Sequence, residues 1–263
     1  MEFATHSDVI DLSHPMTPDM PNFPSAPAFN LIPYYRLGDF ELPNGYWGCN
    51  EAVAMSGHSG THIDALGHVA QNGELFGGVP VAEAQSGIAG LVRHSVEEIG
   101  PIVRRGVFFD IAGLLGVECL EPGQAIDAAL LQRCAAERGI ELQAGDCVLV
   151  RTGWQRHWDG DPQLYIGAQG GVPGIDLSAA VWLADQGAFL IGGDTGTVEV
   201  TSAGVFELPV HLEALTQRGI YLLENVKLDE LAADGRIEFL FVCTPLKLRG
   251  SSGSPVRPVA VFG

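Results

Sequence analysis

The chain has 263 residues, 46% of them hydrophobic and 17% charged, which is typical of a globular protein with a sizeable core in one large or two small domains. Its 14 basic and 32 acidic residues give a formal net charge of −18 at pH 7, which argues against binding nucleic acid or an anionic membrane through a general basic surface. No uncharged run approaches the roughly 20 apolar residues that would span a membrane, and no linker divides the chain, so we expect a single domain over residues 1–263.

The first residues and the cysteines indicate the compartment. Residues 1–8 have neither the basic region nor the apolar core of a signal peptide. The five cysteines are odd in number and widely spaced, without a Cys-x-x-Cys pair or a disulfide framework. We therefore expect a cytoplasmic protein with reduced cysteines.

A proline-rich segment follows a short predicted strand at residues 9–12. Five prolines between residues 15 and 27 fix φ and favour extended backbone rather than helix. This composition predicts that residues 1–35 form an ordered N-terminal arm that lies over another surface. Such an arm could carry Phe23 into a site, although packing in a core is the alternative for any one phenylalanine.

The most informative stretch is His58-Ser-Gly-Thr-His-Ile-Asp-Ala-Leu-Gly-His68, which a half-buried strand around Val53 and Met55 precedes. It gathers three of the eight histidines and one aspartate within eleven residues. Imidazole and carboxylate groups hold zinc, manganese or iron, and an open position on such a metal can activate water. The stretch predicts a metal site.

The spacing of these side chains excludes one regular element. A helix would place His58 and His62 on one face but turn Asp64 about 200° away. A flat strand would place all four side chains on one face, but it would separate His58 from His68 by roughly 33 Å. Glycines at 57, 60 and 67 permit turns. We therefore predict a strand that leads into a glycine-broken loop.

The second half of the chain repeats the order helix, glycine, strand. Asp127 can cap a helix that ends before Gly139, and Asp176 or Ser178 can cap another that ends before Gly187. The repeat predicts an α/β fold with partly parallel strands. The third helix is expected at residues 212–218, and strands are expected at 106–111, 147–150, 188–191, 220–223 and 237–242. Residues 250–255 are expected to form a loop before a final strand.

An acidic residue follows two of these predicted strands, either at once or after two glycines. Glu224 follows the apolar run 220–223, Asp194 follows residues 191–193, and residues 151–152 end the strand at 147–150. In open α/β sheets, sites gather beyond the carboxyl ends of strands. This position favours a functional Glu224, whereas position alone makes His211 a surface histidine.

The histidine stretch is similar to the H-x-G-T-H-x-D-x-x-x-H signature of the cyclase superfamily, which includes bacterial kynurenine formamidase, isatin hydrolase and certain polyketide cyclases. The resemblance extends to residues 11–15, 145–154, 193–195 and 219–225. It implies a layered β/β/α (swivelling-type) architecture with a mixed sheet.

Carried over to this chain, the formamidase pattern implies a role for each residue. His58 and His62 would bind a first divalent metal, and Asp64 would bridge to a second. His211 would belong to that second ion, with Glu224 touching one or both. His68 would be the general acid/base, and Phe23 would line the substrate pocket. Isatin-hydrolase-like members use one manganese ion. The resemblance therefore leaves open whether one or two ions bind and whether they are zinc or manganese.

The resulting hypothesis is metal-dependent hydrolysis of a small aromatic amide, either an aryl formamide such as N-formylkynurenine or a lactam such as isatin. A divalent ion lowers the pKa of bound water toward about 7, and His68 can carry the proton to the leaving nitrogen. The alternatives are a polyketide-type cyclase, in which the metal polarises a carbonyl, and a metal-storing or sensing protein. Phe23, Trp47 and Phe76 are expected near a flat substrate, and the proline-rich arm suggests a homodimer or homotetramer.

Overall fold

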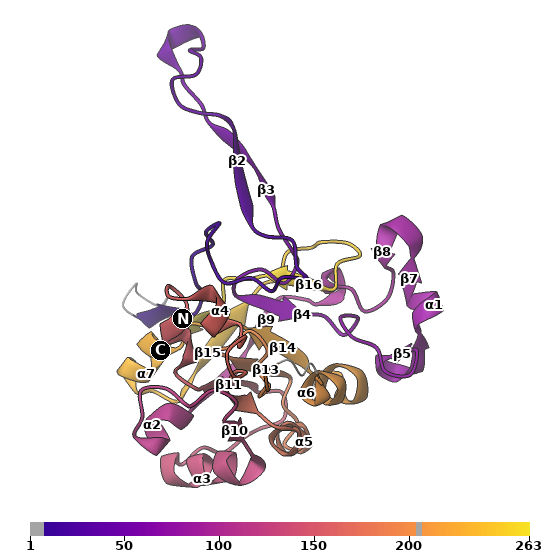
Figure 1. The fold of residues 1–263 in the computed structure, drawn as a ribbon, viewed down its shortest axis with the longest axis vertical. Helices are drawn as coiled ribbons and strands as arrows, with labels where there is room; N and C mark the ends of the chain where they lie inside the picture. Colours follow the sequence, from indigo (N-terminus) through magenta and orange to yellow (C-terminus); the bar gives the residue numbers. More distant parts are fainter. Residues whose placement is uncertain (1–7, 204–206) are drawn as a thin grey trace.

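A computed structural model describes residues 8–203 and 207–263 of the chain, so residues 1–7 of the predicted arm lie outside the described residues. The molecule is built on a nine-stranded mixed sheet (Figure 1). In spatial order its strands are β1 (Val9–Asp11), β17 (Val259–Val261), β15 (Glu238–Cys243), β9 (Ile102–Asp110), β11 (Cys147–Arg151), β13 (Leu190–Gly193), β14 (Tyr221–Glu224), β4 (His62–Asp64) and β16 (Gly253–Pro255).

The centre of the sheet consists of four parallel strands, β9, β11, β13 and β14. The segments that connect them contain α2 (Ile111–Leu115), α3 (Ala128–Arg138), α5 (Leu177–Asp185) and the short α6 (Pro209–His211), which continues as the π-helix η7 (Leu212–Arg218). Asp127 caps α3 through the backbone N–H of Leu130, and Gly139 ends it in the left-handed conformation. The helix–glycine–strand order predicted from the sequence is confirmed.

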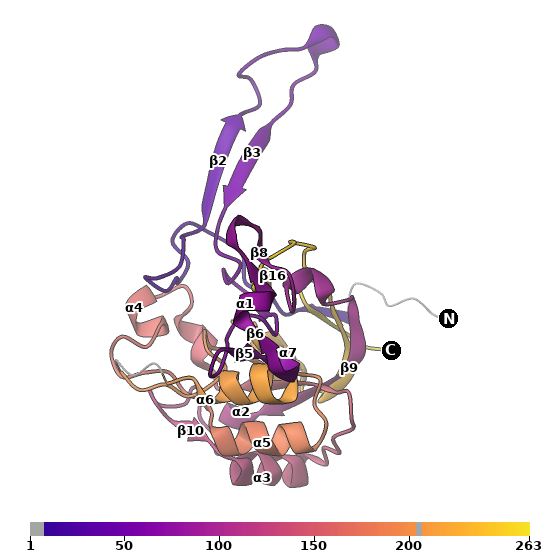
Figure 2. The same cartoon turned by 90° about the vertical axis from the view of Figure 1, so that its right-hand side faces the viewer.

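The two faces of the sheet pack into different cores. Val107, Phe109, Val148 and Val150 face the core under the helices, whereas the alternate residues Phe108, Cys147 and Leu149 face a second core. Both faces of the central strands are therefore buried, which explains their continuous apolar runs. Figure 2 shows α3 and α5 together on the helical side. The α/β fold with a single mixed, layered sheet is confirmed.

Antiparallel strands complete the sheet at both edges, and one of them was not expected. Residues 250–255 were predicted as a loop, but Gly253–Pro255 form β16, which pairs with β4. The prediction was wrong there because only the fold shows that this short segment, with Ser254 fully buried, lies beside the histidine strand. A Cβ at Gly253 would come within 2.5 Å of the His58 ring, so β16 approaches closely only because residue 253 is glycine.

The proline-rich segment and the hairpin that follows it adopt different arrangements. Met20 and Phe29 are buried against Trp154, Trp158 and Tyr165 in a third core, so this part of the segment lies on the body. The strands β2 (Asn30–Tyr35) and β3 (Asn50–Ala54) then form a hairpin that projects away from the rest of the molecule (Figures 1 and 2). Large apolar side chains on it are exposed, among them Leu31, Ile32, Tyr34, Tyr46 and Trp47.

Shorter elements complete the described chain. They are α1 (Val81–Ala84), α4 (Pro162–Tyr165), α7 (Asp229–Asp234), β5 (Glu74–Leu75), β6 (Val79–Pro80), β7 (Gln85–Ser86), β8 (Gly90–Leu91), β10 (Ala125–Ile126), β12 (Gly174–Ile175), and the 3-10 turns η2 (Pro43–Gly45), η3 (Phe76–Gly78), η4 (Gly87–Ala89), η5 (Val96–Glu98) and η6 (Trp154–His157). Within the described residues, no helix has the length and apolar character needed to cross a membrane. All five cysteines are free.

Candidate metal centre and pocket

The antiparallel pairing of β4 with β14 places three of the predicted site residues together. His62 and Asp64 are two residues apart and share one face of β4, and the register sets Glu224 directly opposite His62. Ile63, between them, points into the second core. His62 Nε2 lies 3.1 Å from Glu224 Oε2 and 3.6 Å from Asp64 Oδ1. All three side chains are buried.

His211 and His58 approach the same carboxylates from outside β4 and β14. His211, on α6, has its Nε2 3.2 Å from Glu224 Oε1 and 3.7 Å from Asp64 Oδ2. His58 Nδ1 lies 2.7 Å from Asp64 Oδ1, and its Nε2 lies 2.9 Å from Ser252 Oγ. The position-based expectation of a surface histidine at 211 was wrong, because α6 buries this side chain against the sheet.

The glycines of the histidine stretch act in two ways. Gly60 has a φ of +61°, which turns the chain into β4. A Cβ at Gly57 would lie 2.8 Å from the Gly253 carbonyl oxygen, and one at Gly67 would lie 2.6 Å from Leu91. Gly57 and Gly67 are therefore needed for close packing rather than for a left-handed turn. Together they let His58 and His68 lie beside the short strand.

Two groups of atoms in this cluster could each hold a cation. His62, Asp64 and Glu224 offer one ligand atom each within 4.8 Å of one another, and so do His58, Asp64 and His68. Asp64 belongs to both groups, as a bridging carboxylate would. The resemblance instead pairs His58 with His62 on one ion, so the observed grouping divides the histidines differently. The His68 ring also lies beside the His58 ring, with centroids 4.1 Å apart and planes tilted by 36°.

Three buried polar atoms in the cluster make no hydrogen bond of regular geometry, and their contacts, at 3.1–3.7 Å, are with other groups of the same cluster. They are His62 Nε2, Asp64 Oδ2 and Glu224 Oε1. A buried polar atom without a partner costs free energy, and such atoms are rare in folded proteins. A divalent cation would be a partner for all three, so the residues present fit a metal ion.

The charged groups of the cluster shift one another's pKa values in compensating directions. Burial lowers the pKa of His62, but the hydrogen bond and charge of Glu224 and the charge of Asp64 outweigh it and raise the pKa to about 8. Burial also opposes a proton on His211, yet its contacts with Glu199 and Glu224 raise that pKa to about 10. Burial favours protonated carboxyls, but the histidines hold the pKa of both Asp64 and Glu224 below the usual range. Protons thus occupy positions that a cation would take.

Glu199 supports His211 from behind and was not identified from the sequence. It is fully buried, contacts His211 Nδ1, and accepts hydrogen bonds from the backbone N–H groups of Val210 and His211 at 3.1 Å. The preceding Val198 has a φ of +57°, which is strained for a β-branched residue. A carboxylate in this position fixes the ring so that Nε2 faces the cluster. The only sign of this role in the sequence is that Glu199 is an acidic residue between two valines, at residues 198 and 200.

A similar support fixes His62. The carbonyl oxygen of Gly60 accepts hydrogen bonds from His62 Nδ1 and from the side-chain amide of Asn225, both at 2.9 Å. Asn225 in turn accepts a hydrogen bond from the Tyr165 hydroxyl at 2.8 Å. These bonds direct His62 Nε2 toward Glu224.

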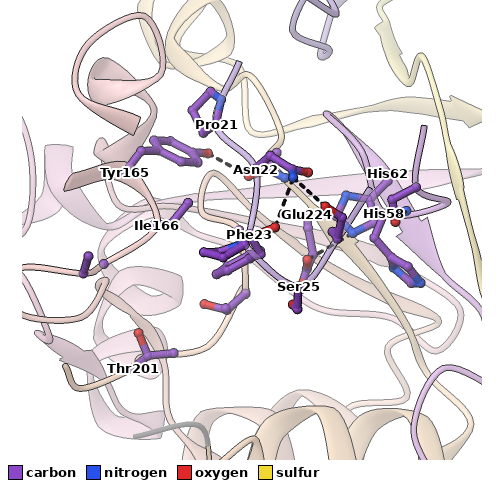
Figure 3. Close-up of a pocket in the computed structure, with 18 of the residues that line it drawn as sticks. Pro21, Asn22, Phe23, Ser25, His58, His62, Tyr165, Ile166, Thr201 and Glu224 are labelled. Carbon is purple, nitrogen blue, oxygen red and sulfur yellow. Dashed lines mark hydrogen bonds and ion pairs between the residues drawn. The ribbon is translucent and has the colours of Figure 1, made fainter. Parts of the chain in front are cut away.

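The cluster lies at the floor of a cavity of about 790 Å³. Its walls come from residues 21–27, from α4 and the residues after it, and from parts of 196–208. Figure 3 shows Phe23, Tyr165 and Ile166 at the same cavity as His58, His62 and Glu224. Phe23 packs against Gly196, where a Cβ would meet its ring at 3.2 Å.

Other residues expected near the site lie elsewhere. Trp47 is on the projecting hairpin and is half exposed, and Phe76 packs against Gly219; neither lines the cavity. Both expectations rested on residue type without a position, and both were wrong. The Asp194 carboxylate is fully buried and accepts hydrogen bonds from residues 152 and 153, so it supports the scaffold.

Comparison with known proteins bears on this arrangement. Residues 10–200 match the model of the Cyclase family, which carries the description "Putative cyclase". The chain belongs to the cyclase family. A relative named kynurenine formamidase, from Bacillus thuringiensis, is 27% identical over 255 residues, which cover 96% of this chain and 97% of the relative. Cyclase-like protein 3 of Oryza sativa is 24% identical, covering 96% of this chain and 79% of that protein.

Solved structures of the cyclase family have the same fold. A crystal structure of a novel cyclase superimposes with a TM-score of 0.89 at 27% identity, covering 98% of this chain and 90% of that one. Isatin hydrolase A from Ralstonia solanacearum gives a TM-score of 0.73 at 24% identity, with 97% and 92% covered, and shows the likeness of fold alone.

Proposed function

We propose that this cyclase-family protein is a metal-dependent hydrolase of a small aryl amide, either an aryl formamide or a lactam. The observation that carries the proposal is the convergence of three buried atoms without a regular hydrogen bond, from His62, Asp64 and Glu224, beside the cavity that Phe23 and Tyr165 line. The formamidase name of the Bacillus relative and the hydrolase name of the Ralstonia neighbour support the same reaction class.

The ligands of the proposed zinc or manganese ions are the groups of the cluster. His62, Asp64, Glu224 and His211 would hold one ion, and Asp64 with His58 would provide a position for a second. When bound, the metal would polarise the carbonyl group of the substrate and lower the pKa of a water molecule. Glu199 and the Gly60 carbonyl hold the rings of His211 and His62 in orientation.

His68 is the proposed general acid/base. It lies beside His58 and lines the cavity, within reach of a substrate that enters over the cluster. In hydrolysis, the oxygen of water bonds to the amide carbonyl carbon while the carbon–nitrogen bond breaks. His68 takes the proton of the attacking water and returns a proton to the leaving nitrogen. A formamide yields an arylamine and formic acid, and a lactam opens to an amino acid.

The direct test is hydrolysis of N-formylkynurenine and isatin, followed by ultraviolet absorbance, with chelator-treated protein and with protein reloaded with Zn²⁺ or Mn²⁺. We expect activity on at least one substrate only after reloading. Full activity in the chelated protein would contradict the metal's role. Absence of activity with every substrate and both metals would reject the hydrolase and favour the polyketide-type cyclase.

We also propose that the chain forms a homodimer or homotetramer. The hairpin exposes Leu31, Ile32 and Tyr34, at 52%, 53% and 81%. A second exposed apolar group, containing Ile88, Val92 and Leu248, lies where residues 89–91 meet Gly250. A second copy related by a twofold axis could cover both surfaces. Light scattering should give a dimer or tetramer at micromolar concentration, and a monomer at that concentration would contradict this proposal.

A further inference from the structure

The wall of the cavity has no cationic side chain. All fourteen lysines and arginines of the chain lie within the described residues, and none of them lines the cavity. Among the described residues, the titratable groups that line the cavity are histidines 58, 62, 68 and 211 and Glu224, all in the cluster, and the Tyr165 hydroxyl, whose pKa burial raises well above its ordinary value. Beyond the cluster the wall is therefore uncharged.

Basic residues near the wall in sequence are paired with carboxylates that do not line the cavity. Arg218, between His211 and Glu224 in the chain, pairs with Glu213 and Asp185, at 2.8 and 3.0 Å. Arg151 forms ion pairs with Asp110 and Asp229, at 2.9 and 2.8 Å. Arg156 pairs with Glu118, and Lys227 contacts Glu230. In this part of the described chain, these basic side chains are already paired and are not poised to turn into the cavity and meet an anion.

Three of the neutral polar side chains of the wall form hydrogen bonds within the protein, and the others are uncharged. The Asn22 amide donates to the carbonyl oxygens of Phe23 and Ala26, and the Tyr165 hydroxyl donates to Asn225. The Thr197 hydroxyl donates to the Glu199 carbonyl oxygen. A carboxylate lodged against this wall would lose water without gaining a cation. The chain's net charge of −18 adds a long-range repulsion.

We infer that the substrate is uncharged outside the group that reaches the cluster. This inference rests on the proposed hydrolase function and narrows its substrate class to neutral aryl formamides and lactams. An aryl formamide that carries a carboxylate side chain is disfavoured, because the wall offers only the Phe23 ring, Ile166 and neutral groups to its far end. The expected preference for a neutral substrate is about 10- to 100-fold, which corresponds to one buried polar group left without a partner.

The test compares two substrates with the same scissile bond in the metal-loaded protein. One is 2′-formamidoacetophenone, which is neutral, and the other is 3-(2-formamidobenzoyl)propionate, which adds a carboxylate. We expect kcat/KM to be at least about tenfold higher for the neutral compound. An equal or higher value for the carboxylate would overturn the inference. Hydrolysis of neither, nor of isatin, would reject the proposed function instead.

Binding tests the inference independently of turnover. Calorimetry with the deformylated compounds, 2′-aminoacetophenone and 3-(2-aminobenzoyl)propionate, measures the preference of the wall even in a protein without hydrolase activity. Tighter binding of the neutral ligand supports the inference. Equal or tighter binding of the acid overturns it.

A gain-of-charge variant tests the physical reason. Gln163 is an exposed residue of α4 that lines the cavity, and the nearby Asp161 is already engaged as the cap of α4. Gln163→Arg should improve kcat/KM, or binding, for the carboxylate relative to the neutral compound by about tenfold. The neutral control Gln163→Met should leave the ratio as in the wild type. An unchanged ratio in Gln163→Arg would overturn the claim that a missing cation excludes the carboxylate.

Discussion

The floor and the wall of the cavity differ in how they are built. The floor is set by the register of β4 on β14 and is supported by Glu199 and the Gly60 carbonyl, so its charged groups have little freedom. The wall comes from the extended segment 21–27, from the short helix α4 with the residues after it, and from parts of 196–208, and it is apolar or neutral. A rigid sheet thus positions the proposed metal chemistry, while loops decide which molecule reaches it.

The largest expected effect is removal of a floor ligand. His62→Ala should abolish metal binding at its position and lower kcat/KM by at least about a thousandfold, because the chemistry of the ion is lost with it. Elemental analysis and turnover measure both effects. The control His94→Ala removes a histidine ring that bonds to the Phe76 carbonyl oxygen and does not line the cavity, and it should keep metal and activity. A His62→Ala protein with full metal content would contradict the assignment.

His68→Ala should separate catalysis from metal binding. We expect kcat to fall by about 10²–10⁴, the usual contribution of general acid–base catalysis, with metal content unchanged. Because His68 also lies within ligand distance of His58 and Asp64, loss of a metal equivalent in this variant would show that it is a ligand instead.

Glu199→Gln should weaken the floor without touching a ligand atom that faces the cavity. The neutral amide no longer supports the His211 ring as a carboxylate does, so metal affinity should fall by about 10–100-fold. Titration against a competing chelator measures this change. Glu213→Gln, which removes an exposed ion pair with Arg218, is the matched control and should leave affinity unchanged. Equal metal affinities in the two variants would contradict a supporting role of Glu199 at His211.

Phe23→Ala should affect the wall alone. Loss of the ring that packs on Gly196 should raise KM by about tenfold or more while metal content stays at the wild-type level. Phe23→Leu should give a smaller rise because it keeps apolar contact. Unchanged KM in Phe23→Ala would mean that the substrate does not contact this wall.

The smallest expected effect concerns His14, which stacks on Trp158 away from the cluster. Burial, with help from the charge of Lys227, lowers its pKa from 6.5 to about 4. The unfolded chain therefore binds the proton first as pH falls, and the free energy of unfolding should decrease by about 1–3 kcal/mol between pH 6.5 and 4. Denaturant unfolding of His14→Gln should show a pH dependence smaller by that amount; an identical slope would contradict it.

Sequence patterns predicted the floor better than the wall, for physical reasons. Alternation on a strand and the position of Glu224 after an apolar run are local features, and the fold preserves them. Glu199 and β16 act through contacts between distant segments, which no local pattern encodes. Aromatic residue type alone could not distinguish Phe23, which lines the cavity, from Trp47 on the hairpin.

Metal titration of chelator-treated protein tests the central claim most directly. Calorimetry with Zn²⁺ or Mn²⁺, in buffers of different ionisation enthalpy, should show one or two ions bound per chain with protons released, since protons on His62 and His211 occupy the positions of the cation. The same titration of His62→Ala should lose at least one equivalent. Wild-type protein that takes up no more metal than this variant would contradict the account.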